Sequence, residues 1–173
     1  MRKKILLTVS LTLIFAVNAF SQITSVYTNL DDKNCKAVNT DEENGISYRG
    51  RCPGVGGYAL ELLEGDLRQT VNVIAPNKRK FELNLTNISY AFSYVGTKAE
   101  WRLNGKTPVA LIIRFNSSEN LEDSSKVTSY LTVSKITRNE ICLVDVIKPS
   151  QNQNEKARQS ADEAINKPCL KFE

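Results

Sequence analysis

Apolar and polar residues alternate with a period of two through most of the chain. This alternation is typical of strands with one buried face and one face in water. Runs of this kind span Tyr58–Leu62, Leu67–Val73, Phe81–Leu85, Ala99–Leu103, Val109–Phe115, Leu131–Val133 and Cys142–Val146. Turn residues separate consecutive runs, which favours antiparallel pairing between neighbours. We therefore expect a mainly β domain.

Two short segments are predicted to be hairpin turns. Glu64-Gly65-Asp66 separates the first two runs, and Asn104-Gly105 separates two later ones. The Asn-Gly dipeptide predicts a type I′ turn, because both residues tolerate positive φ. Pro108 stands at the start of the return strand, where a missing N–H does little harm. Residues 116–126 are rich in Ser, Asn, Glu and Asp and are expected to form a long polar loop.

The periodicity changes near the C-terminus, which predicts a helix after Pro149. Its apolar positions recur every three to four residues, at Ala157, Ala161, Ala164 and Ile165. Asn152 is the expected N-cap, with Glu155 three residues later, and Pro168 ends the helix. A stripe of alanines lets a helix lie close to a sheet. The predicted fold is an antiparallel β-sandwich or barrel with a C-terminal α-helix.

The first 21 residues have the character of a secretion signal peptide. Three basic residues precede the apolar run Ile5–Val17, and small residues suited to a signal peptidase follow it. The mature chain is expected to begin near Phe20 or Gln22. No comparable apolar run follows, so we expect no transmembrane anchor. Residues 22–173 are predicted to form a single secreted domain.

The net charge of the mature chain argues against nucleic-acid binding. The signal peptide carries three of the 23 basic residues and none of the 19 acidic ones, which leaves 20 basic residues and a net charge of +1. Phosphate recognition needs Lys and Arg concentrated on one face. The dense cluster Lys78-Arg79-Lys80 is interpreted as a charged turn.

Cysteine usage indicates disulfides rather than a metal site. The four cysteines are Cys35, Cys52, Cys142 and Cys169. An even number in an oxidising compartment allows three pairings. Pairing Cys35 with Cys52 and Cys142 with Cys169 closes two loops of modest length, and this is the pairing that we expect. Zinc is the alternative, but the chain has no closely spaced cysteine pair and no histidine. We predict neither a metal nor a cofactor. On its strand, Cys142 is expected to share an inward face with Val144 and Val146.

The absence of histidine also removes Ser-His and Cys-His catalysis. Paired carboxylates remain, since Glu64 and Asp66 flank Gly65 and could divide acid and base as in a glycosidase. The simpler interpretation is a solvated turn in which Asp66 bonds its own backbone. Asp66 and Arg68 are two residues apart, so they would share a strand face and could form an ion pair that locks the turn.

The candidate binding surface combines the loop Gly54–Tyr58 with the turn Glu64–Arg68, because loops at strand ends carry recognition. The residues predicted to bind are Gly56, Gly57, Tyr58, Glu64, Asp66 and Arg68. The alternative for the glycines is a tight loop leaving a disulfide, since glycine reaches φ values that other residues resist. Trp101 alternates with apolar neighbours and is expected in the core instead.

Several motifs extend over nearly all of the mature chain. They are Tyr27-Thr28-x-Leu30, Arg51-Cys52-Pro53-Gly54-x-Gly56-Gly57, Glu64-Gly65-Asp66-Leu67-Arg68, Glu100-Trp101-Arg102 and Ala157-Arg158-x-x-Ala161-Asp162, with Cys35 and Cys169. Together they resemble a pattern in small exported bacterial proteins. The resemblance implies a bacterial envelope protein and brings no activity with it. A weaker likeness links Tyr94 and Trp101–Lys106 to periplasmic lysozyme inhibitors, without their Lys-Gly order.

These observations predict a periplasmic protein that acts by binding rather than by catalysis. The expected partner is an envelope protein or a wall glycan. The alternatives are a carboxylate-dependent hydrolase of cell-wall or glycan substrates, and a lysozyme-inhibitor-like protein.

Overall fold

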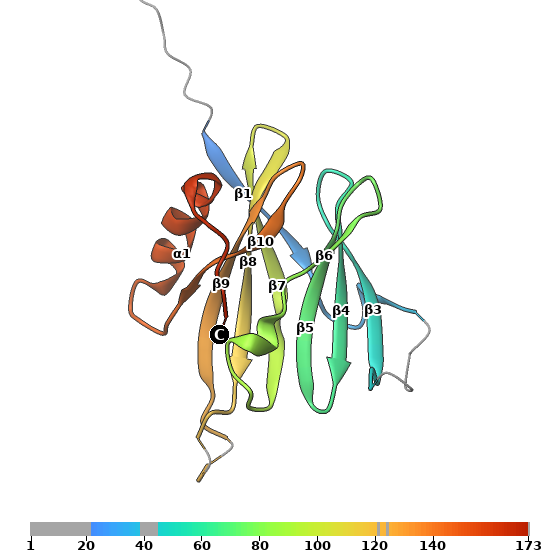
Figure 1. Ribbon diagram of the computed structural model, residues 1–173, viewed down its shortest axis with the longest axis vertical. Coiled ribbons are helices and arrows are strands. Elements are labelled where there is room, and N and C mark those ends of the chain that lie inside the picture. The colour runs from blue at the N-terminus through green and yellow to red at the C-terminus, as the bar shows by residue number, and fades with distance from the viewer. Residues whose placement is uncertain (1–21, 39–44, 121, 124, 173) are drawn as a thin grey trace, which may run out of the picture.

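A computed structural model of the chain describes residues 22–38, 45–120, 122–123 and 125–172 (Figure 1). The predicted signal peptide lies outside these residues. The strands are β1 (Ile23–Asn29), β2 (Lys36–Ala37), β3 (Tyr48–Pro53), β4 (Ala59–Gly65), β5 (Arg68–Ile74), β6 (Lys80–Glu82), β7 (Ser93–Asn104), β8 (Thr107–Ser117), β9 (Thr128–Ile136) and β10 (Ile141–Ile147). The helix α1 spans Gln153–Asp162, and 3₁₀ turns span Leu85–Asn87 and Ala164–Asn166. The mainly β class with a C-terminal helix is therefore confirmed.

The strands form one open, mixed sheet in the order β10-β9-β8-β7-β5-β4-β3-β2, with β1 also beside β7 and β6 beside β5. The described strand pairs are antiparallel except β5 and β7, which meet at one parallel pair, Arg68 and Ser93. This junction divides the sheet into two halves, β1 with β7–β10 and β2–β6 (Figure 1). Each half is antiparallel, as the alternation predicted.

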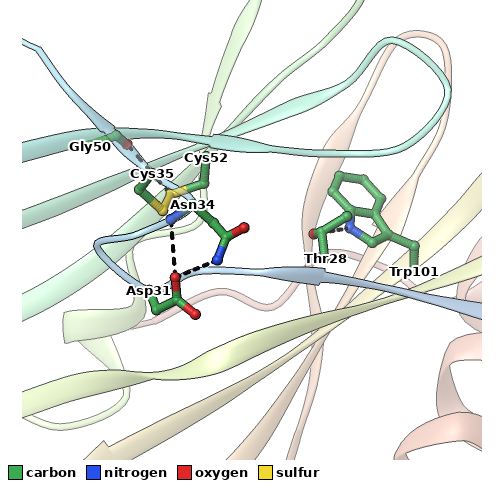
Figure 2. The surroundings of a disulfide bond; sticks show 7 residues. All are labelled: Thr28, Asp31, Asn34, Cys35, Gly50, Cys52 and Trp101. Atoms are coloured by element: carbon green, nitrogen blue, oxygen red, sulfur yellow. Dashed lines mark hydrogen bonds between the residues drawn. A yellow bond between two sulfur atoms is a disulfide. The ribbon is translucent and has the colours of Figure 1, made fainter.

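Both halves contribute inward side chains to a single main core. It includes Leu60 and Val71 from one half and Trp101, Leu111 and Phe115 from the other, all fully buried. The indole N–H of Trp101 donates a hydrogen bond of 2.9 Å to the Thr28 hydroxyl (Figure 2). The predicted burial of Trp101 is confirmed.

Helix α1 covers the outer face of β8 and β9 with small side chains. Ala157, Ala161 and Ala164 are buried there against Ile112 and Val133. Ile165 faces solvent instead, so its predicted place on the stripe is wrong, because the chain changes to a 3₁₀ turn after α1. Within the described residues, no helix has the length and apolar character needed to cross a bilayer.

The start of α1 is fixed by a different residue from the one predicted. Asn152 occupies the N-cap position, but its side chain makes no capping hydrogen bond. The Gln153 side chain instead donates hydrogen bonds of 2.7 Å to the Ser129 carbonyl and 2.9 Å to the Ile147 carbonyl. The first turn is therefore attached to the sheet rather than capped locally.

Both predicted disulfides are present. Cys35–Cys52 closes a sequence separation of 17 residues where the chain passes from β1 to β2 (Figure 2). Cys142–Cys169 closes 27 residues and holds the C-terminal segment against β10. The Leu170 N–H adds a hydrogen bond of 2.8 Å to the Leu143 carbonyl.

The two hairpin turns differ from their predicted positions or types. In the first, Gly65 pairs with Arg68, so Asp66 and Leu67 form the loop and Leu67 is not in the strand. In the second, Asn104 pairs with Thr107, which makes Gly105 and Lys106 the loop. Of these two residues Gly105 alone has positive φ, at 62°. This is the pattern of a type II′ turn rather than the predicted type I′.

Strand β10 contains a bulge that changes which side chains point inward. Its register with β9 shifts between Leu143 and Asp145. Cys142 and Val144 consequently face α1, whereas Val146 packs against the main core. The prediction that all three share one face is wrong for Val146, because a bulge reverses the alternation after it. Cys142 is half-buried.

Candidate binding surface

The turn between β4 and β5 presents an apolar side chain in a strained position. Asp66 and Leu67 have φ of 50° and 56°, the pattern of a two-residue type I′ loop. An L-residue other than Asn or Asp in this region costs about 1–2 kcal/mol. The Leu67 side chain is 63% exposed, so core packing does not compensate for the strain. Strain held in place at an exposed apolar residue points to a functional role.

The guanidinium of Arg68 is fixed beside this turn by three contacts. Its Nε donates a hydrogen bond of 2.8 Å to the Tyr90 carbonyl. One terminal nitrogen pairs with the Asp66 carboxylate, which confirms the predicted ion pair. The guanidinium carbon lies 5.6 Å from the centroid of the Phe92 ring, within the range of a cation–π contact. Arg68 is therefore held in place in the absence of any partner.

Two aromatic residues, Tyr90 and Phe92, contact Arg68, and Tyr94 lines a hollow together with Phe92. Tyr90, Phe92 and Tyr94 are 77%, 50% and 49% exposed. Tyr94 lies in β7, whereas Tyr90 and Phe92 belong to the segment that precedes it. We call Leu67, Arg68, Tyr90, Phe92 and Tyr94 the aromatic surface. Exposed aromatic side chains close to an arginine are typical of interaction sites.

Two hollows lie along the aromatic surface. The larger has a volume of about 480 Å³ and is lined by Leu63, Thr70 and Thr86 together with Arg68 and Tyr90. The smaller, about 190 Å³, lies between Leu67, Phe92 and Tyr94. The larger volume falls within the roughly 300–1,000 Å³ of sites that hold a ligand or an anchoring side chain.

Glu64 lines both hollows. Its carboxylate accepts a hydrogen bond of 2.6 Å from the Gln69 side-chain amide. The Gln69 carbonyl oxygen accepts a bond of 2.9 Å from the Val95 N–H, which orients the amide. The hollows thus combine apolar walls with one ordered carboxylate.

The structure brings together half of the sequence-predicted site. Glu64, Asp66 and Arg68 lie at the aromatic surface, at the end of β4. Gly56, Gly57 and Tyr58 precede the other end of β4, so they do not join them. The two predicted loops therefore do not form one surface.

Packing accounts for the glycine loop. Gly56 and Gly57 have φ of 63° and 83°. A Cβ on Gly56 would lie 3.0 Å from the Pro108 side chain, and the Tyr58 ring lies 6.1 Å from the ring of Trp101. This geometry matches the tight-loop interpretation of the glycines.

The carboxylates Glu64 and Asp66 make the contacts of a hairpin turn. The general acid of a hydrolase is usually a carboxyl group in a desolvated pocket. The Asp66 side chain is 81% exposed and paired with Arg68. Glu64 is bonded to Gln69. The observed contacts stabilise a turn.

One grouping in the described residues has the composition of a metal site, namely Glu140, Cys142 and Cys169. Both sulfur atoms belong to the same disulfide. They are therefore not available as thiolate ligands.

The sequence interpretation missed Leu67, Tyr90 and Phe92 as surface residues. Leu67 was expected on a strand. The only available signal was the presence of three aromatic residues, Tyr90, Phe92 and Tyr94, in five positions; the chain bends at Tyr90, so strand alternation does not place them on one face. The residues that carry the likeness to lysozyme inhibitors do not share one surface. Tyr94 and Lys106 lie at opposite ends of β7, and Trp101 is fully buried.

Comparisons with protein-family models, with curated proteins and with solved structures find no match for this chain.

Proposed function

We propose that this protein is exported by its N-terminal signal peptide and acts in the periplasm as a non-catalytic binding module of the bacterial envelope. Two disulfides support folding in an oxidising compartment. The basic and apolar character of residues 1–21 supports export.

The observation that carries the proposal is the aromatic surface, with its fixed Arg68 and strained Leu67. Tyr, Phe and Arg are enriched at protein interfaces, and residues of this kind supply most of the binding energy. Because Arg68 is already held by Tyr90, Asp66 and Phe92, little side-chain freedom is lost on binding. The partner is another envelope protein, and one of its apolar side chains fills the larger hollow.

The test is cross-linking of the tagged protein in intact cells, with identification of the captured partner. The double variant Tyr90→Ser and Phe92→Ser removes two exposed rings without opening the core. Ile165→Ser is the matched control, because Ile165 is an equally exposed apolar residue on a different element. The wild type and the control should capture one stoichiometric protein, and the double variant should lose it.

Unchanged capture by a folded double variant would contradict the proposal. Sedimentation with purified peptidoglycan, run on the same three proteins, distinguishes the partner class. Wild-type sedimentation that the double variant loses would assign the aromatic surface to a wall glycan instead of a protein.

A further inference from the structure

A second recess lies on the sheet where α1 leaves part of the outer face uncovered. Its volume is about 160 Å³, and its walls come from β1, β7, β8, β9 and α1. We call it the helix-side pocket. It shares no lining residue with the two hollows of the aromatic surface.

The ionisable walls of this pocket carry an excess of positive charge. Lys98, Arg114 and Arg158 line it, and Glu100 is the carboxylate among its lining residues. Arg158 Nε binds Glu100 at 2.7 Å, so these two charges neutralise each other. Two cationic side chains, Lys98 and Arg114, are left over.

The neighbouring carboxylates do not neutralise Lys98 or Arg114. Arg102 lies 3.8 Å from Glu100 but binds Asp162 through two nitrogens at 2.7 and 2.8 Å. Glu100 also accepts a hydrogen bond of 2.5 Å from the Ser25 hydroxyl. Each carboxylate in this network therefore has its own arginine.

Among the residues that the structure describes, the side-chain partners of Arg114 are all neutral. Its guanidinium donates to the Ser129 hydroxyl at 2.8 Å and, at 3.4 Å each, to the side-chain oxygens of Gln153 and Asn154. Lys98 is exposed at the pocket, and its ammonium makes no ion pair within the part of the chain that the structure describes. A guanidinium with long bonds to neutral amides can exchange them for charge-assisted bonds to an anion.

We infer that the helix-side pocket binds a small anion through a carboxylate or phosphate group held by Arg114 and Lys98. The planar fork of a guanidinium matches either group with two parallel hydrogen bonds. The volume lies below the roughly 300 Å³ at which sites for drug-sized ligands begin, which selects a small ion over a polymer. Ile112, Leu131 and Ala157 line the rest of the pocket and leave an apolar wall for a short carbon chain.

Calorimetric titration with inorganic phosphate and with acetate, at constant ionic strength, tests this inference. The wild type should bind at least one of them saturably. Arg114→Gln should weaken binding about tenfold or more, because it removes the charged donor. Lys98→Gln should weaken it several-fold. Lys106→Gln, an exposed cation at the β7–β8 turn, should leave it unchanged.

Binding of phosphate alone or of acetate alone supports the inference and assigns the group that is recognised. Absence of saturable binding of both by the wild type overturns it, as does unaltered binding by Arg114→Gln. If Arg114→Gln fails to fold, Lys98→Gln decides, because Lys98 is exposed and the described residues offer it no side-chain partner whose loss could unfold the domain. Unaltered binding by that variant would then reject the pocket.

Discussion

Leu67 occupies a backbone conformation that glycine or asparagine would adopt more easily, and its apolar side chain lies in water. The register of β4 and β5 leaves two loop residues and requires positive φ at both. A sequence selected for stability alone would place a different residue there. Folding stability therefore does not account for a leucine at this position.

Leu67→Gly should raise the free energy of unfolding by roughly 0.5–1 kcal/mol. Relief of about 1–2 kcal/mol of strain is partly offset by the backbone entropy of glycine, about 0.5–1 kcal/mol. The same change should weaken capture of the envelope partner. Leu67→Ala is the matched control, since it removes the side chain but keeps the strain. A less stable Leu67→Gly protein in urea denaturation would show that the turn is not strained.

Thr28→Val should cost about 1–3 kcal/mol of unfolding free energy, although it preserves side-chain shape. The change removes the acceptor of the Trp101 indole N–H and leaves a buried donor unsatisfied. Thr24→Val, at an exposed position of the same strand, should change stability by much less. Urea denaturation of both variants measures the difference, and equal losses would refute this role of Thr28.

At the scale of elements, the attachment of α1 depends on ion pairs between helix and sheet. Burial alone would raise the pKa of Glu100, but hydrogen bonds from Arg158 and Ser25 outweigh it and lower the pKa below its usual value. A carboxyl group with a lowered folded-state pKa contributes stability above its unfolded pKa, about 4.3. That contribution is lost as the pH falls through the lower folded value.

Glu100→Gln should therefore reduce stability at pH 7 by about 1.5–3 kcal/mol, the range for hydrogen bonds to charged groups. It should also flatten the decline of stability as the pH falls below the unfolded pKa of about 4.3. Urea denaturation across this pH range measures both effects. Glu82→Gln, an exposed carboxylate on β6, is the control and should change neither. An acid decline as steep in Glu100→Gln as in the wild type would contradict the assignment.

Most of the strands and the helix could be predicted from the sequence, whereas the places where strands join or change register could not. Alternation predicts strands such as Val109–Phe115, because successive side chains of a strand point to opposite faces of the sheet. The bulge after Leu143 and the parallel pair of Arg68 with Ser93 depend on hydrogen bonds between distant segments, which local patterns do not encode. The helix-side pocket could not be predicted for the same reason. Arg114 lies on β8 and Arg158 on α1, and they line one pocket only because α1 packs on the sheet. The three aromatic residues from Tyr90 onward were visible in the sequence.

For the whole molecule, each disulfide closes a short loop within a larger two-part sheet. Replacing Cys142 and Cys169 with Ala should cost about 3–4 kcal/mol, by the entropy of a 27-residue loop in the unfolded chain. The 17-residue separation of Cys35 and Cys52 should give a slightly smaller loss, about 3 kcal/mol. Thermal unfolding of both double variants tests the order. A much larger loss at the shorter loop would show that this disulfide acts mainly on the folded state.

The single parallel pair between β5 and β7 lies directly beneath the aromatic surface. The Ser93 N–H donates to the Leu67 carbonyl at 3.1 Å, and Leu67 and Phe92 come from opposite sides of this pair. A partner on the aromatic surface therefore contacts both halves of the sheet and opposes their separation. At a hundred times its dissociation constant it would add about 2.7 kcal/mol to the free energy of unfolding. The melting temperature therefore reports whether a partner occupies the aromatic surface. Fractions of an envelope extract can be screened by the rise in melting temperature that they cause.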